Sequence, residues 1–181
     1  MVGCLGYLVK GKMKVIGVDV GLEGAIACLD EKGKVLFVQD MPVVFVKKGR
    51  KQVRLIDVRE VVRIFARVGK QVFVMIEKTS PAPAKCSTPQ ANWGLGYGAG
   101  VIEGVVVAKG LKYEKVEPRE WQKYFKFPGQ KRGQTKEMSY YRASQLFPDV
   151  ELKTERGRVL DGRADALLIA EYGRRRYMLG K

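Results

Sequence analysis

Apolar residues near the start of the chain fall into short runs, each of which ends at a polar or glycine-containing turn. The runs are KVIGVDVG at 14–21, GAIACLD at 24–30 and KVLFVQDM at 34–41. Short apolar runs rich in β-branched residues are typical of buried strands, and connections this short favour antiparallel pairing. The pattern therefore predicts a meander of three strands that begins near Met13.

Helical and strand patterns alternate in the rest of the chain. A helix is predicted at 54–69, with apolar positions at Leu55, Val58, Val62 and Phe65. The basic stretch KKGRKQVR at 47–54, just before it, is interpreted as a solvated loop. The remaining predicted elements are strands at 71–77 and 112–118 and helices at 91–110, from Pro118, at 135–148 and from Asp161.

This order of elements predicts one α/β domain. Its sheet is expected to be mixed and five-stranded, with a three-strand antiparallel meander and two parallel strands, covered by helices on both faces. Residues 1–12 are interpreted as an N-terminal extension, 13–173 as the domain and 174–181 as a basic tail. No signal peptide and no apolar run of membrane-spanning length is present, so the expected location is the cytoplasm.

Charge and histidine content narrow the possible functions. The 181 residues include 34 Lys and Arg against 19 Asp and Glu, a net charge of +15, which favours nucleic acid over a protein or membrane partner. No histidine is present, which excludes Ser-His and Cys-His nucleophile pairs and histidine-ligated zinc. The three scattered cysteines fit neither a disulfide framework nor a zinc site.

Four carboxylates stand at positions where a packed core does not explain them. Asp19 and Glu77 end two predicted strands, and Asp161 and Asp165 lie four residues apart in DGRADALLIAEYG. On a helix this spacing places both side chains on one face, about one turn apart. Since burying an unpaired carboxylate costs several kcal/mol, each of the four needs a partner.

Two explanations of these carboxylates remain open at the level of single residues. Each of them can form a salt bridge, and Asp161 and Asp165 can cap or stabilise a helix N-terminus. Taken together, four carboxylates without histidine suit Mg²⁺, or Mn²⁺ in its place, because these ions prefer oxygen ligands. Two such ions roughly 4 Å apart would give phosphodiester hydrolysis, the chemistry of a nuclease, without a nucleotide cofactor.

Several segments together resemble a known family. VIGVDVGLEGAIA, VMIE, WGLGYGAGVIEG, VEPREWQK, TKE, FP and DGRADALLIAEYG, in this order, resemble RuvC-type Holliday junction resolvases, most closely the phage and poxvirus-like branch. The resemblance implies a ribonuclease H-like fold and a homodimer that binds four-way or other branched DNA. Each subunit would nick one strand of the junction and leave 5′-phosphate and 3′-hydroxyl ends.

The resemblance also implies roles for individual residues. The family's four metal-binding acids correspond to Asp19, Glu77, Asp161 and Asp165, although bacterial members usually space the last two acids three residues apart. Lys136 matches a lysine that the family places near the scissile phosphate. Lys123 is close to a second such lysine, one residue beyond Gln122, and a solvated surface position is the alternative for both lysines.

Basic clusters mark candidate DNA contacts. They contain Lys47, Lys48, Arg50, Lys51 and Arg54, then Lys131 and Arg132, and finally Arg174, Arg175 and Arg176. Such contacts would be to phosphates, so binding would weaken with salt. The loop 78–90 is a candidate for the junction centre, and Phe125 and Phe127 are candidates for base stacking or core packing. The run NWGLGYGAG is interpreted as close packing of a helix rather than a phosphate cradle.

Three rival functions follow from the same residues. A nuclease that cuts RNA–DNA hybrids would use the same acids on the same fold. A junction-binding protein without catalysis would not need all four acids. An ATP-binding phosphotransferase of the actin or sugar-kinase type also opens with an Asp-x-Gly strand, but it needs two such domains, and this chain has the length of one.

Overall fold

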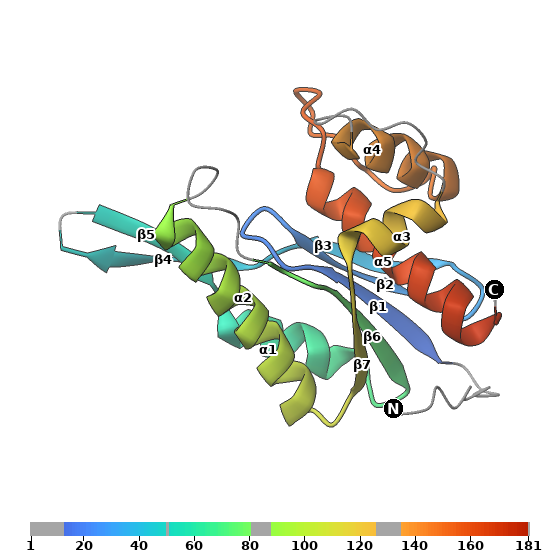
Figure 1. The fold of residues 1–181 in the computed structure, drawn as a ribbon, viewed down its shortest axis with the longest axis horizontal. Coiled ribbons are helices and arrows are strands. Elements are labelled where there is room, and N and C mark those ends of the chain that lie inside the picture. Colours follow the sequence, from blue (N-terminus) through green and yellow to red (C-terminus); the bar gives the residue numbers. More distant parts are fainter. Residues whose placement is uncertain (1–12, 50, 81–87, 126–134, 181) are drawn as a thin grey trace.

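The computed structural model describes residues 13–49, 51–80, 88–125 and 135–180. Its main sheet has five strands in the order β3-β2-β1-β6-β7 (Figure 1). These strands are β1 Lys14–Asp19, β2 Ala25–Leu29, β3 Val35–Asp40, β6 Val72–Glu77 and β7 Lys112–Val116. The first three pair antiparallel, whereas β6 pairs parallel with β1 and with β7. The predicted meander with two parallel strands is confirmed.

Helices cover both faces of this sheet, as predicted (Figure 1). One face carries α1 Val58–Arg67 and α2 Pro89–Ala108, and the other carries α3 Pro118–Tyr124, α4 Thr135–Leu146 and α5 Asp161–Met178. Each face has its own apolar core, the first around Ile16, Phe65 and Ile102 and the second around Trp121 and Leu168. In the described ranges, no helix combines the length and apolar character that crossing a membrane requires.

The centre of the sheet is fully buried because its apolar runs contact helices on both sides. Val15, Ile16 and Val18 of β1 have no solvent exposure, and neither do the residues of β2. Cys28 of β2 is part of this core, and burial raises the pKa of its thiol to about 11. This thiol therefore acts as a core side chain.

The segment interpreted as a solvated loop is instead a second, two-stranded sheet. Strands β4 Val43–Lys48 and β5 Lys51–Ile56 pair antiparallel, and the hairpin extends away from the main sheet (Figure 1). Gly49 follows β4 with a φ of 62°, a conformation that glycine adopts without strain and that tight hairpin turns require. We call residues 43–56 the basic arm.

Helix α1 is shorter than predicted and presents a different face to the core. Asp57 caps its N-terminus by accepting hydrogen bonds from the amides of Arg59 and Glu60, so Leu55 falls within β5 instead. The buried side chains are Val61, Ile64 and Phe65, while Val58 and Val62 are exposed. The sequence of this helix has apolar residues three and four positions apart on two of its faces, so either face could have been assigned to the core.

Helix α2 begins at Pro89, so the glycine-rich run is helical throughout. The Thr88 hydroxyl caps it by accepting from the amide of Ala91 at 3.1 Å. Close packing explains Gly98, where a Cβ would lie 2.8 Å from Ile56 Cδ1. It does not explain the other glycines of the run, because a Cβ at Gly94, Gly96 or Gly100 would meet nothing within 4 Å.

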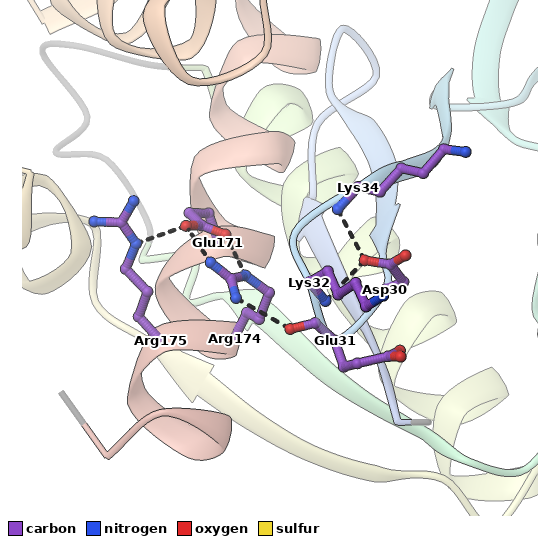
Figure 2. Close-up of polar contacts among 7 residues, drawn as sticks. All are labelled: Asp30, Glu31, Lys32, Lys34, Glu171, Arg174 and Arg175. Atoms are coloured by element: carbon purple, nitrogen blue, oxygen red, sulfur yellow. Dashed lines mark hydrogen bonds and ion pairs between the residues drawn. The ribbon is translucent and has the colours of Figure 1, made fainter. Parts of the chain in front are cut away.

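The predicted basic tail is part of α5, which continues to Met178. Arg174 is buried and donates to both Glu171 carboxylate oxygens, at 2.6 and 2.8 Å, and to the Glu31 carbonyl at 3.1 Å (Figure 2). Arg175 donates to the same Glu171 at 2.6 Å. These contacts join the last turns of α5 to the turn between β2 and β3.

Candidate active site

Asp19 and Glu77 lie side by side at the C-terminal ends of two neighbouring strands in the middle of the main sheet. Each is the last residue of its strand, and β1 and β6 run parallel with Val18 opposite Ile76. Side chains alternate along a strand, so Asp19 points to the same face as Gly17, and Glu77 to the same face as Met75. Gly17 and Met75 both contact α5. The two carboxylates therefore share the face of the sheet that α5 covers.

Glycines bring the start of α5 directly onto the end of β1. A Cβ at Gly17 would lie 2.2 Å from the Ala166 carbonyl oxygen, and one at Gly162 would lie 2.2 Å from the Glu23 carbonyl oxygen. At Gly24 it would lie 2.2 Å from the carbonyl oxygen of Asp19. Backbone therefore packs on backbone at these positions, which places the first turn of α5 beside Asp19.

The result is a cavity of about 550 Å³ lined by three of the four predicted acids, Asp19, Asp161 and Asp165. The Oδ1 atom of Asp165 is buried. Two further acids in the lining are held by arginines, since Arg54 binds Glu23 at 2.6 Å and Arg163 binds Asp40 through two contacts of 2.7 and 3.0 Å. Segments separated by more than 140 residues thus contribute carboxylates to one cavity.

Glu77 lies next to this cavity rather than in its lining. It accepts a hydrogen bond at 3.0 Å from the indole Nε1 of Trp121, which is completely buried. Burial raises the pKa of the Glu77 carboxyl, and the Trp121 hydrogen bond opposes this shift by favouring the ionised form. In the described part of the chain, no three acidic or thiol side chains come close enough together to form a ready-made metal cage.

The donors present are nevertheless of the type that Mg²⁺ takes. All are carboxylate oxygens, and Mg²⁺ commonly keeps several of its waters while binding one or two carboxylates together with substrate phosphate oxygens. Asp19 and Asp165 face the same cavity from different elements, which suits such an open site. Asp161 stands one helical turn from Asp165 and adds a third carboxylate.

The two predicted lysines come from α3 and α4. Lys123 lines an open groove of about 820 Å³ together with Lys78, the residue after Glu77, and Arg119. Lys78 forms an ion pair with Glu117 at 2.5 Å. Lys136 is the second residue of α4, where the sequence predicted a helix to start. Lys78, Arg119 and Lys123 therefore place cations in a groove that begins next to Glu77.

The structure places the predicted DNA-contacting residues in three kinds of position: on the basic arm, outside the described residues, and in contact with other groups of the protein. Lys47, Lys48, Lys51 and Arg54 belong to the basic arm, whereas Arg50, Lys131, Arg132, Phe127 and residues 81–87 of the loop lie outside the described residues. Phe125 is in the core and not available for stacking. Arg176 contacts Glu120 and Tyr172, so all three arginines of the GRRRY cluster are engaged by groups of the protein itself.

Two residues of the site were missed by sequence analysis. Arg158 lines the acidic cavity from the turn that precedes α5, in which Gly157 has a φ of 79°. In the ranges that the structure describes, Arg158 makes no side-chain hydrogen bond or ion pair, unlike Arg54 and Arg163. Trp121 was assigned only to a helix. For Arg158, the one feature of the sequence that could have indicated its role is the turn glycine directly before it.

No family model matches the sequence, and no curated protein matches it. Similarity is found among solved structures. Thermus thermophilus RuvC in complex with a Holliday junction substrate shares 14% identity and superposes with a TM-score of 0.56, covering 92% of this chain and 97% of that one. The present chain has the RuvC fold.

Two further structures share the RuvC fold. Another T. thermophilus RuvC structure has 12% identity and a TM-score of 0.52, with 91% of this chain and 96% of that one covered. The yeast mitochondrial Holliday junction resolvase Ydc2 has 14% identity and a TM-score of 0.52, with 91% and 78% covered. At these identities the likeness concerns the fold. None of the three is a viral protein, so the phage and poxvirus-like branch stays a prediction from sequence.

Proposed function

We propose that this protein is a Mg²⁺-dependent endonuclease that resolves four-way DNA junctions by paired symmetric nicks, leaving 5′-phosphate and 3′-hydroxyl ends. One observation carries the proposal. Asp19 lines a single cavity together with Asp161 and Asp165, which are remote from it in sequence, and strand β6 ends at Glu77 next to this cavity. The net charge of +15 supports a DNA substrate, and the RuvC fold supports a resolvase. The phage and poxvirus-like branch of the resolvases is the subgroup we propose.

In this proposal, the side chains of the cavity have separate tasks. Asp19 and Asp165, with Glu77 and Asp161, would hold two divalent ions, Mg²⁺ or Mn²⁺. When bound, these ions supply positive charge at the scissile phosphate and lower the pKa of the attacking water. Trp121 orients the Glu77 carboxylate through its indole hydrogen bond. Lys123 and Lys136 would offset the charge of the phosphates next to the cut.

The direct test is a nicking assay on a four-way junction in Mg²⁺ and Mn²⁺. We expect symmetric cuts in two strands of like polarity and products that a DNA ligase reseals. A linear duplex and an RNA–DNA hybrid of the same sequence should remain intact. Preferential cutting of the hybrid would assign the protein to hybrid nucleases, and junction binding without cutting in either metal would make it a binding protein.

Arg158 is expected to contact the scissile phosphate. It is the cation of the cavity that no acid of the described ranges engages, and it stands three residues before the start of α5. Replacement by Ala should slow nicking about a hundredfold with little change in junction affinity, because a positioned donor acts mainly on the charge that develops in the transition state. Single-turnover kinetics measure the cleavage rate and fluorescence anisotropy measures the affinity.

Arg156→Ala is the matched control, because Arg156 is exposed in the same turn and does not line the cavity. It should leave the nicking rate within about twofold of wild type, the range expected for a surface change. Equal rates for Arg158→Ala and the wild type would remove Arg158 from the site.

Helix α2 supports the homodimer. Trp93 and Val107 of this 20-residue helix are 61% and 56% exposed, and Gly96, Gly100 and Gly104 are exposed between them. The only charged residue of the helix, Glu103, is bound by Tyr113 and Lys115, both at 2.7 Å. Each exposed glycine weakens a helix by about 1 kcal/mol relative to Ala. Since a Cβ at Gly100 or Gly104 would meet nothing, close approach of a second copy gives these glycines a role.

Gly100→Glu should therefore convert a dimer to a monomer. The monomer itself has room for the side chain, and Glu favours a helix more than Gly, so unfolding temperature and helix content should not fall. Val62→Glu adds the same charge at an exposed site on α1 and should leave the dimer intact. Light scattering after gel filtration reports the mass; a wild-type monomer at tens of micromolar would refute this interface.

A further inference from the structure

The basic arm is an unusual surface feature that the proposed catalytic residues do not account for. Among the residues that the structure describes, its two strands pair only with each other, and an isolated two-stranded hairpin is marginally stable in water. Contacts at its base hold it in place: Ile56 is buried, and Arg54 donates to Glu23 at 2.6 Å and to the Leu22 carbonyl at 3.2 Å. Residues 43–56 contain five Lys and Arg and no Asp or Glu, so the arm attracts a polyanion.

One face of the basic arm continues the wall of the acidic cavity. In the register of the hairpin, Val43 is opposite Ile56, Phe45 is opposite Arg54 and Lys47 is opposite Gln52. Residues opposite each other in an antiparallel pair share a face. Val43 and Arg54 of this face line the cavity that contains Asp19 and Asp165. Phe45 and Lys47 therefore lie just outside the cavity, in the direction in which the arm extends.

Phe45 is the aromatic side chain of this face, with 62% of its surface in solvent. A phenyl ring left in water loses the free energy that burial would give it, and the described residues around Phe45 leave most of its surface uncovered. Lys47, two residues further along β4, is suited to a phosphate, whereas Arg54, opposite Phe45, is bound to Glu23. An aromatic ring beside a phosphate-binding cation is the arrangement by which proteins stack on unpaired bases.

We propose that Phe45 stacks on an unpaired nucleobase of the DNA strand that enters the acidic cavity, while Lys47 contacts a neighbouring phosphate. This inference rests on the proposed function and adds how the site recognises its substrate. In a duplex, each base is already stacked on its neighbours and offers no free face. At a branch point, stacking is interrupted, so a ring beside the cavity selects DNA whose bases are exposed near the cut.

The test measures binding separately from cutting. Junctions labelled with fluorescein are titrated in EDTA, and 5-iodo-2′-deoxyuridine at each branch-point position is used for photocrosslinking, followed by peptide mapping. We expect a crosslink at Phe45 for at least one branch-point position. Phe45→Ala and Phe45→Leu should each weaken junction binding about 5- to 150-fold, because base–aromatic stacking is lost. Phe45→Trp should retain wild-type affinity, and duplex affinity should change less than about twofold in all variants.

Val46→Ala is the matched control. Val46 is adjacent in β4, is 43% exposed and points to the opposite face of the arm, paired with Val53. It should bind junctions as the wild type does. Phe45→Leu keeps an apolar side chain of similar bulk, so its loss of affinity is assigned to the missing aromatic ring. Wild-type affinity of both Phe45→Ala and Phe45→Leu, or absence of any crosslink at Phe45, would overturn the proposal.

The outcome for the proposed function is read separately, from nicking in Mg²⁺. A wild-type protein that crosslinks through Phe45 but never nicks would refute the endonuclease and leave the stacking role standing. A protein that nicks junctions but whose affinity is independent of Phe45 would refute only the stacking role.

Discussion

Asp165→Asn should abolish nicking while junction binding is retained. The change keeps the size of the side chain but removes the negative charge from the cavity that Asp19 and Asp161 also line. A divalent ion held there would lose a charged ligand, and we expect cleavage to fall at least about a thousandfold, equivalent to about 4 kcal/mol in the barrier. Single-turnover cleavage in Mg²⁺ measures the rate, and anisotropy in EDTA measures binding.

A second readout distinguishes loss of metal from loss of fold. Asp165→Asn should weaken Mn²⁺ binding in calorimetry while its unfolding temperature stays close to that of the wild type, because Asn keeps the size and shape of the side chain. Asp149→Asn, at an exposed position outside the cavity, is the matched control and should cut normally. If Asp165→Asn nicked at the wild-type rate, the carboxylates of α5 would have no part in the chemistry.

Gly17→Ala should destabilise the protein more than any other single methyl group at the site. A Cβ at this position would lie 2.2 Å from the Ala166 carbonyl oxygen and 2.3 Å from the Ala170 amide nitrogen. Both are backbone atoms of a buried helix, so relief requires α5 to move away from β1. We expect a loss of about 3 kcal/mol or more in the free energy of unfolding, the upper range for overpacking. Urea unfolding followed by circular dichroism measures it.

Gly17→Ala should also displace the carboxylate of Asp165, because Ala166, which the added methyl group would contact, follows Asp165 in α5. We expect cleavage to fall even at temperatures where the variant is folded. Gly94→Ala is the control: a Cβ there meets nothing within 4 Å, and the change should be neutral or add up to about 1 kcal/mol of stability. Similar stability of Gly17→Ala and the wild type would mean that α5 is not held against β1 as described.

Local patterns were sufficient for the main sheet and for most helices. The apolar runs that became β1, β2 and β6 are short and nearly continuous, and such runs pack between two helical layers in almost any α/β arrangement. The placement of Asp19 and Glu77 at strand ends followed directly, since both residues end their runs. The spacing of Asp161 and Asp165 required only that the last segment be a helix.

The basic arm shows where local patterns were misleading. Its cations suggested a solvated loop, although Val53 and Leu55 alternate with Gln52 and Arg54 as in a strand, and Gly49 supplies the turn. The arginines at 174–176 show the reverse case. Their charges suggested a free basic tail, but Glu171 engages Arg174 and Arg175 (Figure 2). Glu120 engages Arg176, because charges carried by a helix that packs on the protein need partners.

The amino-acid sequence alone determined the layer architecture, excluded catalysis by histidine and identified the four candidate carboxylates. These conclusions were possible because periodicity and residue type are local properties. Only the tertiary structure decided that Asp19, Asp161 and Asp165 share a cavity while Glu77 binds Trp121 beside it. It also decided that Arg158 and Phe45 stand next to that cavity. Such neighbours are set by contacts between backbones remote in sequence, above all those at Gly17 and Gly162, where the lack of a side chain lets α5 reach β1 and the turn that follows it.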